Sequence, residues 1–292
     1  MNFLADAENG LDRPEELSER QFELVVRRLA DDLAYGADAS RFVGSGIEYA
    51  QTRPYVPGDP VRQLDWRVSA RTGKPHIKEY EAMKRIPTWM VVDTSESMWV
   101  SSTPLSKHGL AVWLAAALGL VALRRLSPVA VVSGGDRPGR AQPSLLRGRL
   151  WGGLDAMRTR QAPEPTRIAE VVQDLALRSA RRGLFVVLSD LHAPDVLHAL
   201  KLTAQRHDVV VLQPIDPAEV EGSPGGFQRA AEAETGAAFL ASGRRGWLNG
   251  EQGFGPELAG AGVDHIALRT DQDCVTPLQR FLALRGQSGG MV

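Results

Sequence analysis

The sequence has little cysteine, little net charge and no long apolar segment, and each shortage excludes a class of protein. The single cysteine, Cys274, excludes an internal disulfide framework and any metal site built from several thiolates. A formal net charge of −1 gives no overall attraction for nucleic acid. The most apolar run, 109–123, is shorter than the about 20 residues of a spanning helix. With an acidic N-terminus unlike a signal peptide, these features predict a cytoplasmic protein without a membrane span.

Familiar catalytic and nucleotide-binding motifs are also missing. The Gly-Lys pair at 73–74 has Val68 where a phosphate-binding loop places its first glycine, and Pro75 follows the lysine. The metalloprotease motif His-Glu-x-x-His does not occur. His192 could act as a base beside Asp190, but a surface or capping histidine is the simpler interpretation, because no activated nucleophile is evident nearby. The sequence therefore favours a protein that is not an enzyme.

From residue 86 onward, short apolar runs alternate with segments of helical periodicity. This alternation predicts an α/β fold with a mostly parallel sheet and helices on both of its faces. The Gly-rich segment 216–254 shows no clear pattern. Strands are predicted at 89–92, 129–132, 184–188, 209–213 and 265–268, and helices at 109–126, 150–157, 168–177, 196–205 and 275–284.

The first 85 residues have a different pattern. A helix is predicted at 15–35, where apolar residues recur at helical spacing. Two strand-like stretches, 47–56 and 76–83, lie on either side of the turn signal Pro-Gly-Asp-Pro. We therefore predict a helix plus a small β-rich subdomain over 1–85, the α/β domain over 86–285, and a flexible tail over 286–292.

Polar side chains follow two of the predicted buried strands. Asp93, Ser95 and Ser97 come directly after one strand, and Asp190 comes after another. Thr166 lies between these two strands, at the start of a predicted helix. Ligands of open α/β sheets bind outside the carboxyl ends of the strands, so these five side chains are expected at one rim.

Carboxylate and hydroxyl oxygens are the ligands of hard cations. We expect Mg²⁺ at this rim, with Mn²⁺ or Ca²⁺ as alternatives. Asp93 with two serine hydroxyls gives a weakly charged shell, which leaves the ion able to accept an external carboxylate. The competing interpretation is that each residue caps a helix or turn, which is the common role of Asp, Ser and Thr at such positions. The combination of all five favours the metal site.

The pattern Asp93-x-Ser95-x-Ser97, with the later Thr166 and Asp190, resembles the metal-ion-dependent adhesion site of von Willebrand factor A domains. The chain from about residue 44 to residue 285 also resembles the bacterial family catalogued as domain of unknown function 58. That family often has glycines before the threonine, where this chain has Glu-Pro. The segments that carry the family resemblance are 53–59, 61–62, 64–66, 69–71, 78–81, 266–271, 277–278 and 280–282.

The resemblance implies a von Willebrand A-like, Rossmann-like fold and a metal-dependent protein-interaction module. It implies a MoxR-type AAA+ ATPase as partner, and a role in the assembly or maturation of other proteins. A client protein would offer an Asp or Glu carboxylate to the ion. Two alternatives stay open, namely a phosphatase-like hydrolase that uses the same ion, and a metal-independent scaffold.

The β-rich subdomain is dense in arginine, acids and aromatics. One interpretation is a network of ion pairs that holds the subdomain together, because arginine binds carboxylates with two parallel hydrogen bonds. The other is a docking surface for a partner, since arginine and aromatic residues are enriched at interfaces. The candidate docking residues are Arg53, Tyr55, Asp59, Arg62, Asp65, Trp66 and Arg71.

Overall fold

A computed structural model describes residues 11–37, 48–81, 85–135, 142–159, 165–193, 195–221, 227–231, 238–242 and 253–287. It divides into two compact units. The first unit, here called the sheet unit, comprises Met1–Val43 and Ile86–Val292, and the second, here called the hairpin unit, comprises Gly44–Arg85.

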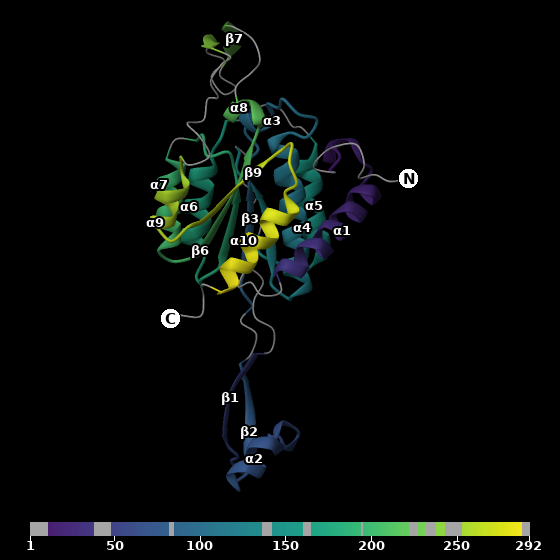
Figure 1. The fold of residues 1–292 in the computed structure, drawn as a ribbon, viewed down its shortest axis with the longest axis vertical. Coiled ribbons are helices and arrows are strands. Elements are labelled where there is room, and N and C mark those ends of the chain that lie inside the picture. Colours follow the sequence, from purple (N-terminus) through teal and green to yellow (C-terminus); the bar gives the residue numbers. More distant parts are fainter. Residues whose placement is uncertain are drawn as a thin grey trace. The chain divides into compact units, whose positions relative to one another are not determined.

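Within the described residues, the sheet unit contains one five-stranded sheet in the order β4-β3-β5-β6-β9, and all of its neighbouring strands are parallel (Figure 1). This confirms the predicted α/β fold class. The strands are fully buried apolar runs in the middle of the sheet, as expected where helices cover both faces. Their bounds are β3 Thr88–Val92, β4 Val129–Ser133, β5 Leu184–Leu188, β6 Asp208–Ile215 and β9 Asp264–Arg269.

Alternate side chains of β3, β4, β5 and β6 enter two separate cores. Met90 and Val92 of β3 pack in the core beneath helices α1, α4, α5 and α10, whereas Trp89 and Val91 pack in the core beneath α6, α7 and α9 (Figure 1). The short helices α3 and α8 follow the carboxyl ends of β3 and β6. The bounds are α1 Glu19–Ala37, α3 Glu96–Trp99, α4 Lys107–Arg124, α5 Arg147–Arg158, α6 Ile168–Arg178, α7 Val196–Ala204, α8 Pro217–Glu221, α9 Gly255–Gly260 and α10 Val275–Gln287.

Helix α4 is the central helix of the first core. It begins after Ser106, whose Oγ accepts a hydrogen bond from Gly109 N at 2.9 Å. By length and mean hydropathy (1.3), α4 is the one helix of the described ranges that could cross a membrane, yet 94% of it is buried inside the protein. The core helix of a soluble protein passes the same test, so this result is weak evidence for a membrane span.

Helix α1 corrects the predicted division of the chain. We predicted that residues 1–85 belong together, but α1 packs against α4 and α10 of the sheet unit. The reason is its apolar stripe. Phe22, Val26 and Leu33 are buried in the first core, and the Phe22 ring lies 4.8 Å from that of Trp113 in α4. At the other end of the chain, α10 continues to Gln287, and the predicted tail beyond it lies outside the described residues.

The hairpin unit consists of two antiparallel strands and a short helix between them. Strands β1 (Glu48–Pro54) and β2 (His76–Glu81) form within the two predicted strand-like stretches, and they pair with each other. Helix α2 (Trp66–Thr72), preceded by the 3₁₀ turn η3 (Val61–Gln63), was not predicted. The Asp65 side chain caps α2, and Gly73 ends it with a φ of +69°.

The Gly-rich segment 216–254 also contains more structure than its sequence indicates. Besides α8, it has an antiparallel pair of strands, β7 (Phe227–Ala231) and β8 (Ala238–Ser242). Residues 222–226, 232–237 and 243–252 of this segment lie outside the described part of the chain.

Candidate functional site

The strand order creates one place where loops diverge. Strand β3 has β4 on one side and β5 on the other, although β5 follows β4 in the chain. The connections leaving the carboxyl ends of β3 and β5 therefore separate, which makes a topological switch point. Open α/β sheets bind ligands in the crevice at such a point. Asp93 follows β3 and Asp190 follows β5 with one residue between, so both predicted carboxylates lie there.

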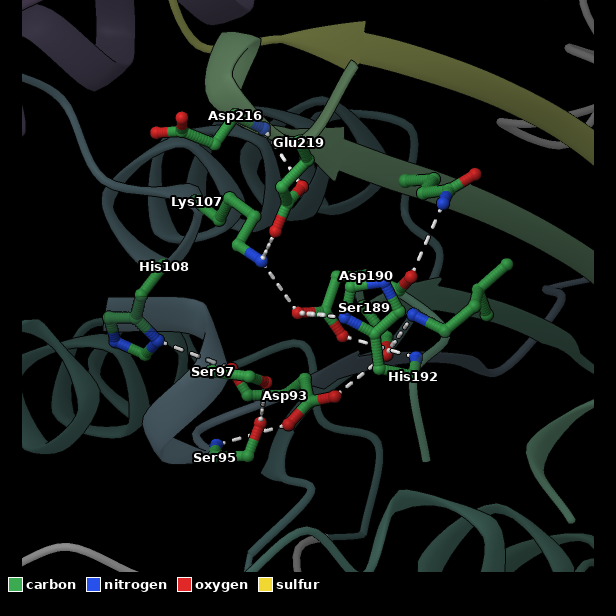
Figure 2. A network of polar contacts seen from close by, with 12 residues as sticks. Asp93, Ser95, Ser97, Lys107, His108, Ser189, Asp190, His192, Asp216 and Glu219 are labelled. Atoms are coloured by element: carbon green, nitrogen blue, oxygen red, sulfur yellow. Dashed lines mark hydrogen bonds and ion pairs between the residues drawn. The ribbon is translucent and has the colours of Figure 1, made fainter. Parts of the chain in front are cut away.

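Asp93 is tied to both loops of this crevice. Its backbone N donates to Leu188 O at 2.9 Å. One carboxylate oxygen, Oδ1, accepts from Ser95 N at 3.0 Å, and the other, Oδ2, accepts from Ser189 Oγ at 2.7 Å (Figure 2). The carboxylate is buried. Asp93 is therefore held in one orientation, with Asp190 as its neighbour in the adjacent loop.

The two serines of the motif lie next to each other. Ser95 Oγ and Ser97 Oγ are 3.0 Å apart, so a short turn directs both hydroxyls to one place (Figure 2). Helix α3 starts immediately after Ser95. Trp99 at its end stacks on buried His108, with ring centroids 4.2 Å apart, and His108 Nδ1 lies 3.2 Å from Asp93 O. These contacts hold the loop of Asp93, Ser95 and Ser97 against helix α4.

Thr166 lies in a loop that packs close to Asp93. Arg167 N donates to Gly134 O at 2.8 Å, and a Cβ on Gly134 would lie 3.3 Å from Asp93 Cα and 3.2 Å from Ile168 Cβ. Thr166 Oγ1 is buried and has no hydrogen-bond partner among the described residues. Buried hydroxyls are almost always satisfied. A missing ligand atom, such as a bound ion or its water, would satisfy this one.

Asp190 is contacted by the side chains of Lys107 and His192. Lys107 Nζ, at the start of α4, lies 2.8 Å from Asp190 Oδ2, and His192 Nδ1 lies 3.3 Å from the same oxygen (Figure 2). Lys107 Nζ also forms an ion pair with Glu219 of α8. The Lys107 side chain is only 1% exposed, whereas that of His192 is 38% exposed. The prediction from sequence did not include Lys107 or Glu219.

The two carboxylates at the switch point have opposite pKa shifts. Burial, then the nearby charge of Asp190, raises the pKa of Asp93 to about 6. Burial also acts to raise the pKa of Asp190, but the His192 hydrogen bond and the Lys107 charge outweigh it, so this pKa is lowered. The hydrogen bond to Asp190 in turn raises the pKa of His192. Among the described residues, Asp93 therefore has no cationic partner, whereas Asp190 contacts Lys107 and His192.

The turn after Asp190 is strained. Leu191 has a φ of +64°, which is rare for a bulky residue and costs about 1–3 kcal/mol. The side chain of Leu191 is buried, and its N donates to Ser189 Oγ at 3.0 Å. The packing imposes a conformation that turns the chain sharply between Asp190 and His192, and strain of this kind concentrates at functional sites.

Helix α8 is fixed to the rim by Asp216. The carboxylate of Asp216 accepts hydrogen bonds from Ser102 N at 2.7 Å and from Ala218 N at 2.9 Å. Asp216 N donates to Glu219 Oε2 at 3.1 Å, so Glu219 has a fixed position (Figure 2). One ligand atom each of Asp190, His192 and Glu219 lies within 4.8 Å of the others, and these three residues form a group that could hold a metal ion. A metal-binding cluster at this rim thus has two possible ligand sets that share Asp190.

The candidate docking residues divide into two kinds. Arg53 binds Asp59 with two hydrogen bonds, of 2.7 and 2.8 Å. These bonds, together with a hydrogen bond from Val56 N, lower the pKa of Asp59 to about 2. Asp65 accepts from the backbone at the start of α2. These three residues have internal structural roles, and Tyr55 is half-buried. Trp66 is 72% exposed, and Arg62 and Arg71 are exposed as well.

The fold and site define a Rossmann-like α/β protein with a buried polar cluster at its switch point. The model of the family described as "Protein of unknown function DUF58" matches residues 51–244, and the chain belongs to this family. Uncharacterized proteins Mb1516 of Mycobacterium bovis and Rv1480 of Mycobacterium tuberculosis are each 31% identical to it over 281 residues, which cover 91% of this chain and 88% of theirs.

Among solved structures, the conserved hypothetical protein BatB from Bacteroides thetaiotaomicron is similar at 15% identity and a TM-score of 0.44. The match covers 69% of this chain and 99% of that chain.

Proposed function

We propose that this protein is a metal-dependent protein-interaction module of the von Willebrand A type. In this proposal a divalent ion, with Mg²⁺ the expected species, is bound by Asp93, Ser95, Ser97, Thr166 and Asp190. Its remaining coordination position binds an Asp or Glu carboxylate of a partner. When bound, the ion would supply the positive charge that attracts this carboxylate, and the chain would supply its position and orientation.

The observation that carries the proposal is the buried Thr166 hydroxyl beside the Asp93 loop, which has no hydrogen-bond partner in the described ranges. The donor set also fits a hard cation, since it consists of oxygens alone. The raised pKa of Asp93 also supports a bound cation. It shows that the ionised carboxylate is disfavoured by burial and by the charge of Asp190, and a nearby positive ion would relieve both effects. The residues present therefore fit the ion that the motif implies.

The expected partner is a MoxR-type AAA+ ATPase, with assembly or maturation of other proteins as the shared role. We expect the purified protein to capture such an ATPase from the same organism in Mg²⁺ but not in EDTA. Asp93→Asn should abolish the capture, because it removes a charged ligand. Asp174→Asn, which removes only an exposed ion pair with Arg178 on α6, is the matched control. Equal capture in EDTA, or by the Asp93 variant, would contradict the proposal.

Two ligand sets compete for the ion, and they are separable. Ser95→Ala removes a ligand from the motif set alone, and Glu219→Gln removes one from the set formed by Asp190, His192 and Glu219. We expect Ser95→Ala to weaken Mn²⁺ binding about tenfold or more, which is the usual effect of losing a ligand or its support. A loss of binding confined to Glu219→Gln would show that the ion is bound by Asp190, His192 and Glu219 instead.

Metal binding should depend on pH because Asp93 must be ionised to bind an ion. Burial and Asp190 raise its pKa to about 6, so protons compete with the ion as the pH falls through 6. We expect the metal-dependent rise in melting temperature to be full near pH 7.5 and to shrink steadily between pH 6.5 and 5. A rise that is unchanged down to pH 5 would show that the ion does not use this carboxylate.

A phosphatase-like hydrolase is the first alternative, and the contact between His192 and Asp190 favours it over other reactions. Turnover of a phosphoester that needs Mg²⁺ and is lost in His192→Ala would support it. The second alternative is a scaffold that docks through exposed Trp66 and Arg62 of the hairpin unit. Capture that survives EDTA but is lost in Trp66→Ala would favour that scaffold.

A further inference from the structure

Lys107 is the most unusual charged residue of the site. It is buried, and its ammonium group contacts the carboxylates of Asp190 and Glu219. A buried ammonium is tolerated only where carboxylates compensate it, because the low-polarity interior penalises an isolated charge. The three side chains therefore form one unit, in which a single ammonium group is shared by the carboxylate of Asp190, after β5, and that of Glu219, in α8.

The position of Lys107 is not explained by the stability of helix α4. Lys107 is the first residue of α4, where the free N–H groups of the helix carry partial positive charge. Acidic residues are favoured in this turn and cations are disfavoured. The side chain also enters the polar crevice rather than solvent (Figure 2). The unfavourable interaction between the ammonium group and the start of the helix is offset by the ion pair that this group forms with Asp190.

Asp190 belongs to both candidate ligand sets for a metal ion. An ion bound at either set would lie close to Asp190, and Lys107 Nζ is already 2.8 Å from Asp190 Oδ2. Charges that close repel strongly in a buried crevice, where neither water nor salt screens them as it does at the surface. An ion entering the site must therefore share Asp190 with the ammonium or displace it.

We infer that Lys107 is a resident cation of this site, whose ammonium group competes with a divalent metal ion for Asp190 and so lowers the affinity for that ion. The inference rests on the proposed metal site. Glu219 offers the ammonium an alternative position, because its Oε2 is held by Asp216 N at 3.1 Å while its Oε1 contacts Lys107. An ion bound at the motif set, which does not use Glu219, would then transfer Lys107 from Asp190 toward Glu219 alone.

A purely structural role for Lys107 makes the opposite prediction. If the ammonium only holds the two acids in position, then removing it would disorder the crevice and weaken metal binding. If it competes with the ion, then removing its charge frees Asp190 and strengthens metal binding. Metal affinity thus separates the two roles, whereas a loss of stability in the metal-free protein is common to both.

The test is Mn²⁺ binding to the full-length protein, measured as loss of the free-ion EPR signal. Lys107→Gln removes the charge but keeps hydrogen-bond donors for Asp190, and Lys107→Met removes both. We expect the Mn²⁺ dissociation constant to fall about tenfold or more in each variant, as the loss of a close like charge in a buried site requires. Lys201→Gln, which removes an exposed pair with Glu257 at 2.6 Å, is the control and should bind as wild type does.

A second measurement on the same proteins is thermal unfolding. Both Lys107 variants should melt below wild type without metal, and saturating Mn²⁺ should raise their melting temperature more than it raises that of wild type. Lys107→Gln keeps the measurement usable if Lys107→Met does not fold.

The outcomes distinguish this inference from the proposed function. Binding by wild type with no gain in the variants would overturn the inference and leave the metal site standing. Binding by the variants but not by wild type would support the inference and overturn metal loading of the natural chain. No Mn²⁺ binding by any of these proteins would overturn both.

Discussion

Asp93→Asn is expected to raise the stability of the metal-free protein at neutral pH while abolishing its response to metal. The native carboxylate is buried near Asp190, and these two facts raise its pKa to about 6. At pH 7.5 it is ionised at a cost to the folded state. Asparagine keeps an acceptor for Ser95 N and presents its amide to Ser189 Oγ, a hydroxyl that can also accept. A gain of about 1–3 kcal/mol follows from a pKa shift of this size.

The sign of this effect sets its pH window. The folded-state pKa of Asp93 lies above the unfolded value of 3.8, so below pH 3.8 the group is protonated in both states and costs nothing. Stability due to this group falls as the pH rises from about 4 to 6, and the full penalty applies above that. The difference in unfolding free energy between variant and wild type should therefore grow across this window and then stay constant.

The measurement is urea unfolding from pH 4 to 8, with and without Mg²⁺. Wild type should gain stability from Mg²⁺ and the variant should not. Asp174→Asn should follow wild type throughout, because that carboxylate is exposed on α6. A variant that is less stable than wild type at pH 7.5 without metal would mean that Asp93 is already compensated by positive charge.

The second large effect is expected at Gly183, which precedes strand β5. A Cβ at this position would lie 2.6 Å from Pro87 O and 2.4 Å from Trp89 Cζ3. The backbone oxygen cannot move without disturbing β3, since Leu184 N donates to it at 2.9 Å. The Trp89 ring is stacked on Phe185 at 4.8 Å and has little freedom to move away.

Gly183→Ala should therefore destabilise the protein by about 3 kcal/mol or more, at the upper end of the range for overpacked cores. Gly152→Ala is the matched control, because Gly152 lies within α5 and a Cβ there meets nothing within 4 Å. It should stabilise the protein by about 0.5–1 kcal/mol. Urea unfolding measures both, and a Gly183 variant as stable as wild type would show that β3 and β5 can separate at low cost.

The sheet was predictable because its central strands are short apolar runs that end in polar residues. The runs before Asp93 and Ser189 correspond to β3 and β5, and the rule for parallel sheets then brings Asp93 and Asp190 to one rim. No tertiary contact was needed for this step. Whether Ser95, Ser97 and Thr166 bind an ion stays a prediction, since the same residue types also cap helices.

Lys107 and Glu219 were not predictable, because their role depends on distant partners. Lys107 follows a helix cap, where a charged residue ordinarily faces solvent, and its two acids lie 83 and 112 residues further along the chain. Helix α2 was missed for another reason. It lacks apolar periodicity, and its only sequence signals are the cap Asp65 and the terminal Gly73.

The pairing of β1 with β2 has a consequence for how this chain can change. Glu48 lies opposite Glu81, so the segment that enters the hairpin unit and the segment that leaves it are neighbours. The unit is one uninterrupted stretch of the sequence, inserted between α1 and β3. Such an insertion can be shortened, or replaced by another segment or a short linker, because joining two adjacent chain ends costs little loop entropy. The sequence of the hairpin unit can therefore diverge between relatives while the sheet and its rim stay the same.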